Sequence, residues 1–295
     1  MNKKGLTATF IFEAESANYG EGVGNVTSLK KISRETGESY SYISRQAIRY
    51  NIINQMGNDN TPLDVDGSVI QFAPEATIKD YAEIDLFGYM KTKKPTKTRS
   101  AVVRLSNAVS LESFNADLDF LTNKGLLDRY NSQGKELKDG GNIAQSEIHK
   151  SYYAYTITID LDKVGIDNND DIEVDNNIKE DRVNRLLDTV KFLYRDIKGR
   201  RENLSPIFAI GGVYDIKNPF FENKVKINNN SIKVNTIKDI LELDDNIIDN
   251  TYVGLIKGIF NNDSEIEKEL SSVSMSEFFG NIKKKVSKYY IEEAK

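Results

Sequence analysis

The segment SYYAYTITIDL, residues 151–161, constrains the fold most, because its side chains alternate in character along its whole length. Alternation with a period of two is typical of a β-strand whose two faces meet different surroundings. Residues 6–14, LTATFIFEA, alternate in the same way, with Leu6, Ala8 and Phe10 on one face and Thr7 and Thr9 on the other. Both segments therefore predict strands. In the later strand, Tyr153, Tyr155, Ile157, Ile159 and Leu161 alternate with Tyr152, Ala154, Thr156, Thr158 and Asp160.

Helical periodicity lies between and after these strands. Residues 181–199 place apolar side chains at i, i+3, i+4 and i+7, and Gly199 is the expected end of that helix. Residues 39–57 predict a second helix with Ile43, Ala47 and Tyr50 on one face, Ser39 or Ser41 as its cap and Gly57 as its stop. Residues 206–214 predict a strand buried on both faces. The order of elements favours an α+β fold, an RRM-like or ferredoxin-like sheet with insertions, over a doubly wound parallel sheet.

Three segments are expected to lie outside this sheet. Residues 58–82 are rich in Asn, Asp and Gly and contain two prolines, so we expect an irregular insertion with at most one short helix. Residues 122–150 predict a long, mobile excursion, and excursions of that length inside a domain are usually functional. Residues 220–295 are mostly helical in pattern and end in a lysine-rich helix.

Composition excludes several kinds of chemistry. The chain has no Cys, which excludes disulfides, zinc knuckles and thiol catalysis, and its single His is residue 149. No stretch approaches the ~18 apolar residues of a membrane span, and the first residues do not form a signal peptide. We therefore expect a cytoplasmic protein that needs no cofactor and no metal.

Charge is segregated along the chain, although the net charge is only −5. Residues 86–110 carry six basic side chains and no acid, whereas residues 160–181 carry nine acids and two lysines. Residues 182–201 are basic again. Such segregation fits either ordinary solvated faces or a surface that binds a polyanion.

Arg45 and Arg49 bear on whether the chain binds a polyanion, because they lie at i and i+4 of a predicted helix. Like charges at this spacing destabilise an isolated helix by a few tenths of a kcal/mol. A phosphate would remove the repulsion, and arginine matches phosphate geometry with two hydrogen bonds, but a neighbouring carboxylate would serve equally. Ser44 and Gln46 add further donors beside the pair.

Five segments, in order, resemble the CRISPR-associated autoregulator family, also called DevR, whose members are backbone subunits of the type I-B Cascade complex. The resemblance covers roughly the first two thirds of the chain. The five segments are LTATFIFEAESANYGEGVGN, SYISRQAIRY, EIDLFGYM, RSAVVRLSNAVSLE and EIHKSYYAYTITIDLDKVG.

The resemblance implies an RRM-like palm with an inserted finger at 54–84, a thumb loop at 110–150 and a mostly helical C-terminal insertion at 220–275. It also implies that copies polymerise head to tail along CRISPR RNA beside other Cascade subunits, and that target DNA is recognised through the guide. No enzymatic activity is expected. The expected RNA-binding residues are Ser44, Arg45, Gln46, Arg49, Lys91, Arg99, Arg104, Asn142, Gln145 and His149.

Some assignments stay open at this point. The aromatic RNA-binding signature of single RRM domains is absent, so Tyr153 and Tyr155 are read as core residues. His149 fits either a strand-edge residue at the thumb base or an RNA contact. The alternatives to the backbone role are a metal-dependent RNA-cleaving subunit of the type III kind, a nucleic-acid-binding regulator and a self-assembling protein without nucleic acid.

Overall fold

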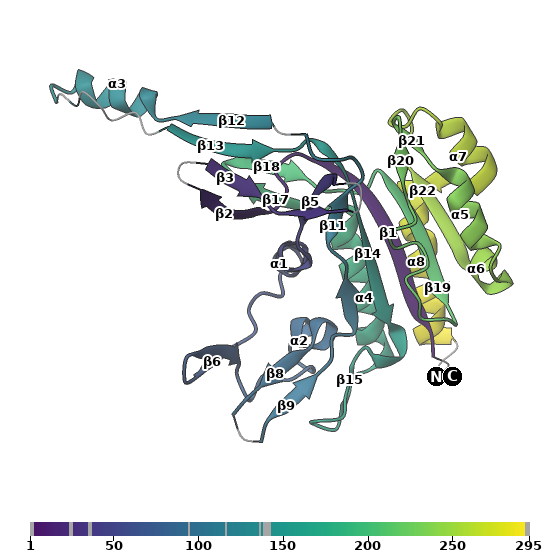
Figure 1. The fold of residues 1–295 in the computed structure, drawn as a ribbon. Coiled ribbons are helices and arrows are strands. Elements are labelled where there is room, and N and C mark those ends of the chain that lie inside the picture. The colour runs from purple at the N-terminus through teal and green to yellow at the C-terminus, as the bar shows by residue number, and fades with distance from the viewer. Residues whose placement is uncertain are drawn as a thin grey trace.

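A computed structural model describes residues 3–23, 26–34, 37–93, 95–115, 117–135, 137 and 143–292. Its centre is a nine-stranded sheet whose path runs β23-β22-β19-β1-β14-β11-β5-β4, with β10 also paired to β14 (Figure 1). The middle strands β1, β14 and β19 are antiparallel to their neighbours. The strands of this sheet are β1 (Gly5–Ala14), β4 (Lys31–Ser33), β5 (Ser39–Ile43), β10 (Val103–Leu105), β11 (Ala108–Ser110), β14 (Ser151–Asp160), β19 (Phe208–Tyr214), β22 (Thr251–Leu255) and β23 (Val273–Ser274).

The two alternating segments form β1 and β14, as predicted, and they pair over their whole length from Gly5–Asp160 to Ala14–Ser151. Their apolar faces build the larger core, in which Phe10 stacks on Phe279 at 5.9 Å between ring centroids. Burial of this face explains why the two sequences alternate so strictly. The helices that cover it are α1 (Arg45–Gln55), α4 (Asn176–Lys191) and α8 (Met275–Ser287), followed by η2 (Lys288–Glu292).

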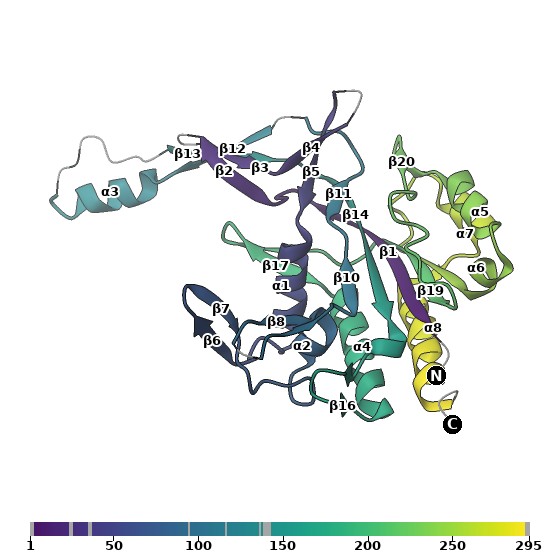
Figure 2. The same cartoon turned by 60° about the horizontal axis from the view of Figure 1, so that its bottom comes forward.

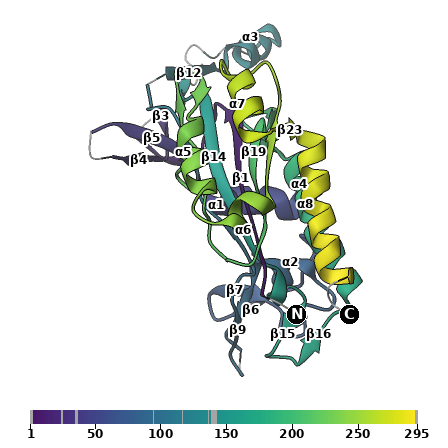
Figure 3. The same cartoon turned by 90° about the vertical axis from the view of Figure 1, so that its right-hand side faces the viewer.

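The opposite face of the sheet is covered only in part. A second core joins Ile11, Phe208 and Ile210 to the C-terminal helices, which lie across the sheet from α8 (Figure 3). The predicted strand at 206–214 is confirmed as β19, and all of its residues are buried. The C-terminal elements are α5 (Val234–Leu241), α6 (Asp245–Asn250), α7 (Asp263–Leu270), and the hairpin β20 (Ile227–Asn228) and β21 (Ser231–Ile232).

Two extensions leave the body of the molecule in different directions (Figure 2). The first contains a hairpin, a short helix and a second hairpin, and lies beside α1 and α4. The second is a long hairpin with a helix at its tip, on a small sheet of order β12-β13-β3-β2. The first comprises β6 (Leu63–Asp66), β7 (Val69–Phe72), α2 (Ala82–Phe87), β8 (Tyr89–Lys91) and β9 (Lys97–Arg99). The second comprises β12 (Asp117–Thr122), α3 (Lys124–Ser132) and β13 (Ile143–Ile148), resting on β2 (Tyr19–Val23) and β3 (Val26–Leu29).

Both extensions contain regular secondary structure. Gly67 and Ser68 form the turn of the β6–β7 hairpin, with Gly67 at φ 62°, so the expectation of an irregular insertion was wrong there. In the other extension, six residue pairs join β12 to β13. Strand pairing satisfies the backbone of both hairpins although few of their side chains are buried.

Two predicted helices have different boundaries. Residues 39–43 form β5, and the helix begins after Ser44, whose hydroxyl accepts a hydrogen bond from Ala47 N at 3.3 Å. Ile48 and Ile52 of α1 are buried and Ala47 packs against the same core, whereas Tyr50 is exposed, so the prediction for Tyr50 was wrong. The helix predicted for 181–199 ends at Lys191, and the hairpin β17 (Tyr194–Ile197) and β18 (Arg200–Asn203) follows. A further short hairpin, β15 (Ile166–Asp167) and β16 (Ile172–Glu173), precedes α4, and η1 (Leu161–Lys163) follows β14.

Candidate nucleic-acid interface

A groove runs across the part of the central sheet that the C-terminal helices leave uncovered. It consists of three hollows of about 430, 500 and 370 Å³ that share lining residues, and we call it the sheet groove. Its floor is polar because the second face of β1 and β14 presents threonines, and the hydroxyls of Thr9 and Thr156 lie 2.7 Å apart. The floor residues are Thr7, Thr9, Ser106, Asn107, Thr156 and Thr158.

The N-terminus of α1 forms one end of the sheet groove. Ser44 donates to Asn18 Oδ1 at 2.6 Å while it caps the helix, so its hydroxyl has two intramolecular partners. Arg45 and Gln46 follow, both exposed and both lining this end. The backbone N–H of Arg45 donates to Asn107 Oδ1 at 2.9 Å, which ties the helix start to the groove floor. Among the described residues, the Arg45 guanidinium has no carboxylate within 4 Å.

Arg49 lies one turn further along α1 in a more enclosed position. Its guanidinium lies 5.0 Å from the ring centre of Phe87 and 3.7 Å from Glu83 Oε1. Burial lowers the pKa of Arg49, and the Glu83 carboxylate opposes that effect. The sequence allowed either a phosphate or a carboxylate beside the arginine pair. For Arg49, a carboxylate is present.

Arg104 lines the middle of the sheet groove from β10. It donates to Asp160 Oδ2 at 3.1 Å, and Lys163 and Lys217 also approach this carboxylate, at 3.2 and 3.6 Å. Burial disfavours the charged form of Asp160, but the hydrogen bonds from Arg104 and Lys163 and the charge of Lys217 hold its pKa below the usual value. Each of these three cations thus has a carboxylate within 4 Å.

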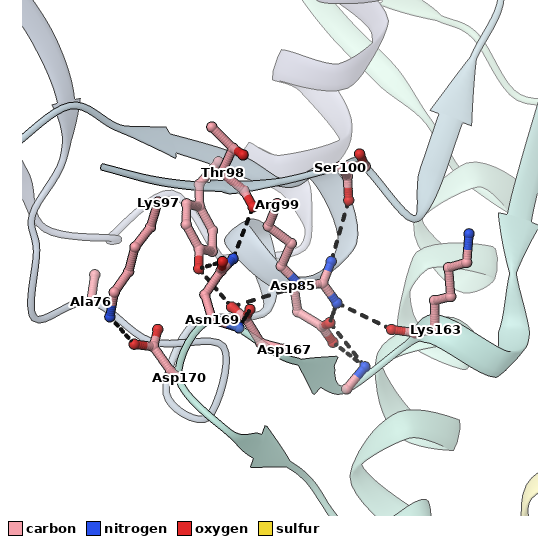
Figure 4. Close-up of polar contacts among 12 residues, drawn as sticks. Ala76, Asp85, Lys97, Thr98, Arg99, Ser100, Lys163, Asp167, Asn169 and Asp170 are labelled. Atoms are coloured by element: carbon pink, nitrogen blue, oxygen red, sulfur yellow. Dashed lines mark hydrogen bonds and ion pairs between the residues drawn. The ribbon is translucent and has the colours of Figure 1, made fainter. Parts of the chain in front are cut away.

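Lys91 and Arg99 do not line the sheet groove. The Lys91 ammonium is buried and donates to the carbonyl oxygens of Pro74 and Ala76. Arg99 donates to Asp85 Oδ1 at 2.7 Å and to the Lys163 carbonyl at 3.1 Å (Figure 4). Arg182 of α4 reaches the other oxygen of the same carboxylate at 2.8 Å. Lys91 and Arg99 are therefore engaged within the chain, away from the sheet groove.

The basic run at 86–110 is largely balanced inside the chain. Lys93 pairs with Asp64, and Lys97 pairs with Asp170. Together with the pairs of Arg99 and Arg104, these contacts bring acids from distant segments onto the run. The simple charge count of the sequence therefore overstates how much of this run is available to a polyanion.

His149 lies at the base of the long hairpin, and its side chain is buried. Its Nδ1 lies 2.7 Å from Ser41 Oγ, and its ring packs edge-on against Phe114 at 5.4 Å. Burial lowers the pKa of His149. Gln145 is half-buried in β13, opposite Phe120. Asn142 lies outside the described residues. The structure thus brings Ser44, Arg45, Gln46, Arg49 and Arg104 together and places Gln145 and His149 elsewhere.

Sequence reasoning missed several groove residues. Thr7, Thr9, Thr156 and Thr158 carried a signal, since each alternates with apolar core residues in a strand. Lys226 and Lys233 line the far end of the groove but lie in the C-terminal third, where nothing in the pattern marked them.

Within the described residues, no group of three or more His, Asp or Glu side chains is placed to hold a metal ion. No helix in the described ranges is both long and apolar enough to cross a membrane.

Comparison with known proteins identifies the family. The model of the family described as CRISPR-associated negative auto-regulator DevR/Csa2 matches residues 6–236. A search of curated proteins finds no significant match. A chain of a solved CRISPR RNA-guided surveillance complex in a pre-nicking state has the same fold, with a TM-score of 0.63 at 10% identity over 96% of this chain and 99% of the other. A chain of a second CRISPR RNA-guided surveillance complex aligns with a TM-score of 0.61 at 13% identity over 97% and 100%. The chain therefore belongs to the CRISPR-associated DevR/Csa2 family.

Proposed function

We propose that this protein is a backbone subunit of a type I CRISPR surveillance complex, which holds the phosphate backbone of a guide RNA in the sheet groove. The spacer bases then face outward, where target DNA pairs with them. The strand order β19-β1-β14-β10, with α1 and α4 on one face, supports an RRM-like palm as the framework.

The observation that carries the proposal is the position of Arg45. It lies at a helix N-terminus on the rim of a polar groove, and no carboxylate neutralises it among the described residues. Phosphate oxygens fit this environment, because a helix start and a guanidinium both favour an anion. Gln46 and Asn107 add donors beside it.

Assembly along the RNA is the second part of the proposal. The helix α3 has no buried residue, and every residue of β12 is exposed, including Phe120. Apolar side chains with nothing to cover them are suited to contact another protein surface. We call the extension formed by β12, α3 and β13 the thumb, and we propose that it contacts the next copy in a head-to-tail array. Such heterologous contacts do not close on themselves. The exposed apolar side chains of the thumb are Leu118, Phe120, Leu121, Leu126, Tyr130, Leu137 and Ile143.

The test of RNA binding is Arg45→Gln, measured with single-stranded RNA over a range of salt concentrations. Loss of one phosphate contact is expected to make the slope of log K against log salt shallower by about 0.7, equally for unrelated sequences. Lys284→Gln on α8, an exposed lysine on the opposite face of the sheet, is the matched control. Equal slopes for wild type and Arg45→Gln would refute the assignment.

Binding without cleavage is also part of the proposal, and the competing function is metal-dependent RNA cleavage of the type III kind. Incubating the protein with a labelled complementary RNA and Mg²⁺ or Mn²⁺ distinguishes the two. We expect the RNA to stay intact. Fragments that depend on both protein and metal would favour the competing function.

A further inference from the structure

The far end of the sheet groove combines parts of the chain that are distant in sequence. Its hollow of about 370 Å³ lies between the sheet face and the segment 221–233. Arg34 and Tyr40 from the β4–β5 region line one side, and Lys226 and Lys233 line the other. Lys233 N donates to the Lys226 carbonyl oxygen at 2.9 Å, so these two lysines lie next to each other across the β20–β21 hairpin.

Three cations at this end lack carboxylate partners. Among the described residues, no acid lies within 4 Å of the charged groups of Arg34, Lys226 and Lys233, whereas Arg104 and Lys217 in the middle of the groove both approach Asp160. Glu222 also lines the hollow, so three basic side chains face one acidic side chain. Cations gathered around a hollow repel one another, and an anion bound between them relieves that repulsion.

Arg34 is held in place by a neighbouring ring. Its guanidinium carbon lies 4.2 Å from the ring centre of Tyr40, and the Tyr40 hydroxyl donates to Glu38 Oε2 at 2.8 Å. Stacking on an aromatic face fixes the plane of a guanidinium and leaves its edge N–H groups available. The hollow is thus lined by one guanidinium stacked on a ring and by two exposed lysines, a combination suited to phosphate oxygens.

We propose that this hollow is a second phosphate-binding site for the same RNA strand, formed by Lys226 and Lys233 together with Arg34. This inference rests on the proposed function, since it extends the path of the RNA from Arg45 across the threonine floor to the β20–β21 hairpin. It gives the C-terminal region a direct part in holding the RNA. The ligand is the phosphodiester backbone, so binding at this site is independent of base identity.

The experiment compares two double variants of equal charge. Lys226→Gln with Lys233→Gln removes both lysines of the hollow, and Lys284→Gln with Lys288→Gln removes two exposed lysines near the C-terminal end of α8. Salt titrations use a single-stranded RNA of about 16 nucleotides, the upper end of the site size of a single-strand-binding domain. Loss of the phosphate contact at this hollow makes the salt slope shallower by about 0.7 for the first variant, and the α8 variant keeps the slope of the wild type.

Several outcomes separate this inference from the proposed function. Equal slopes for the two double variants, together with a reduced slope for Arg45→Gln, overturn the second site and leave the proposed function standing. Unchanged slopes for all variants overturn both. An additive loss when Arg45→Gln is combined with the hollow variant supports two separate contacts on one strand, because distant independent sites add. All four lysines are exposed, so a change in thermal unfolding is not expected.

Discussion

Nδ1 of His149 lies 2.7 Å from the hydroxyl oxygen of Ser41, inside the protein at the base of the β12–β13 hairpin. The same hydroxyl lies 2.7 Å from that of Tyr153, which donates to the His149 carbonyl oxygen at 2.9 Å. The only histidine of the chain is therefore part of a closed hydrogen-bond network that joins β5, β14 and the end of β13.

Titration of His149 is the first prediction. Burial lowers its folded pKa below the value of about 6.5 in an unfolded chain, so the unfolded state takes up the proton first as pH falls. The stabilisation from neutral His149 is complete above about pH 6.5 and is lost as pH falls through the folded pKa. Because the chain has one histidine, a single imidazole NMR signal followed from pH 8 to 5 reports this pKa directly. His149→Gln should flatten the pH dependence of unfolding in that window, and a folded pKa at or above 6.5 would contradict the prediction.

Removal of the Asp85 charge is the second prediction. Asp85 receives hydrogen bonds from Arg99, Arg182 and Gly165 N, the last at 2.9 Å, and is completely buried. Asp85→Asn leaves two buried guanidinium groups without their main counter-charge, so we expect a loss of about 3–5 kcal/mol in urea unfolding.

The control for this variant is an ion pair on the surface. Arg201 and Asp196 pair at 2.9 Å, and both side chains are 64% exposed. Asp196→Asn is expected to leave the free energy of unfolding nearly unchanged, because solvent screens an exposed ion pair. Similar losses for Asp85→Asn and Asp196→Asn would mean that burial of the Asp85 cluster has no energetic effect.

The buried hydroxyl pair of Thr9 and Thr156 gives a third prediction. Thr9→Val removes one partner and leaves the Thr156 hydroxyl without its hydrogen bond, at a cost of about 1–3 kcal/mol. Replacing both residues by Val restores a matched apolar pair of similar shape, so the double variant should lose less than the sum of the single variants. A double-mutant cycle measured by urea unfolding checks this, and strictly additive losses would count against coupling between the hydroxyls.

Contacts of the thumb give a fourth prediction. Leu126→Ser with Tyr130→Ser changes two exposed side chains of α3, so the free energy of unfolding should stay within about 0.5 kcal/mol of the wild type. Coating of a long RNA should become less cooperative, because the variant would weaken the proposed contact to the next copy. Phe192→Ser, a change of an exposed apolar residue outside the thumb, is the control for surface hydrophobicity. Unchanged cooperativity in the α3 variant, with binding measured on long and short RNA, would argue against the thumb contact.

Strands whose pattern reflects their own burial were predictable from the sequence. The segments 6–14 and 152–161 each match a strand to within one or two residues, because apolar residues on one face of each enter the same core. The end of α4 was not predictable in this way. Leu193 and Ile197 continue the helical spacing, but a buried ion pair between Arg195 and Glu202, at 2.7 Å, accompanies a hairpin at this point.

The candidate site was only partly predictable, because contacts between distant segments decide which charged side chains line the groove. Arg45 and Gln46 stand out in the sequence as polar groups on a helix, and they do line the sheet groove. Arg99 belongs to a basic run, but Asp85 and Asp167 bury and neutralise it from other segments. Local charge does not reveal a partner that lies far along the chain, nor does it reveal that Lys226 and Arg34 line the same hollow.

The thumb has a consequence for how such proteins diverge. Its helix contributes no side chain to the core of its own subunit, so substitutions there are tolerated without loss of folding. Under the proposed head-to-tail assembly, the surface that the thumb meets in another copy constrains its sequence. Two versions of the protein encoded in one cell could then acquire different thumb sequences, each matched to its own kind, and assemble into separate complexes without mixing their subunits.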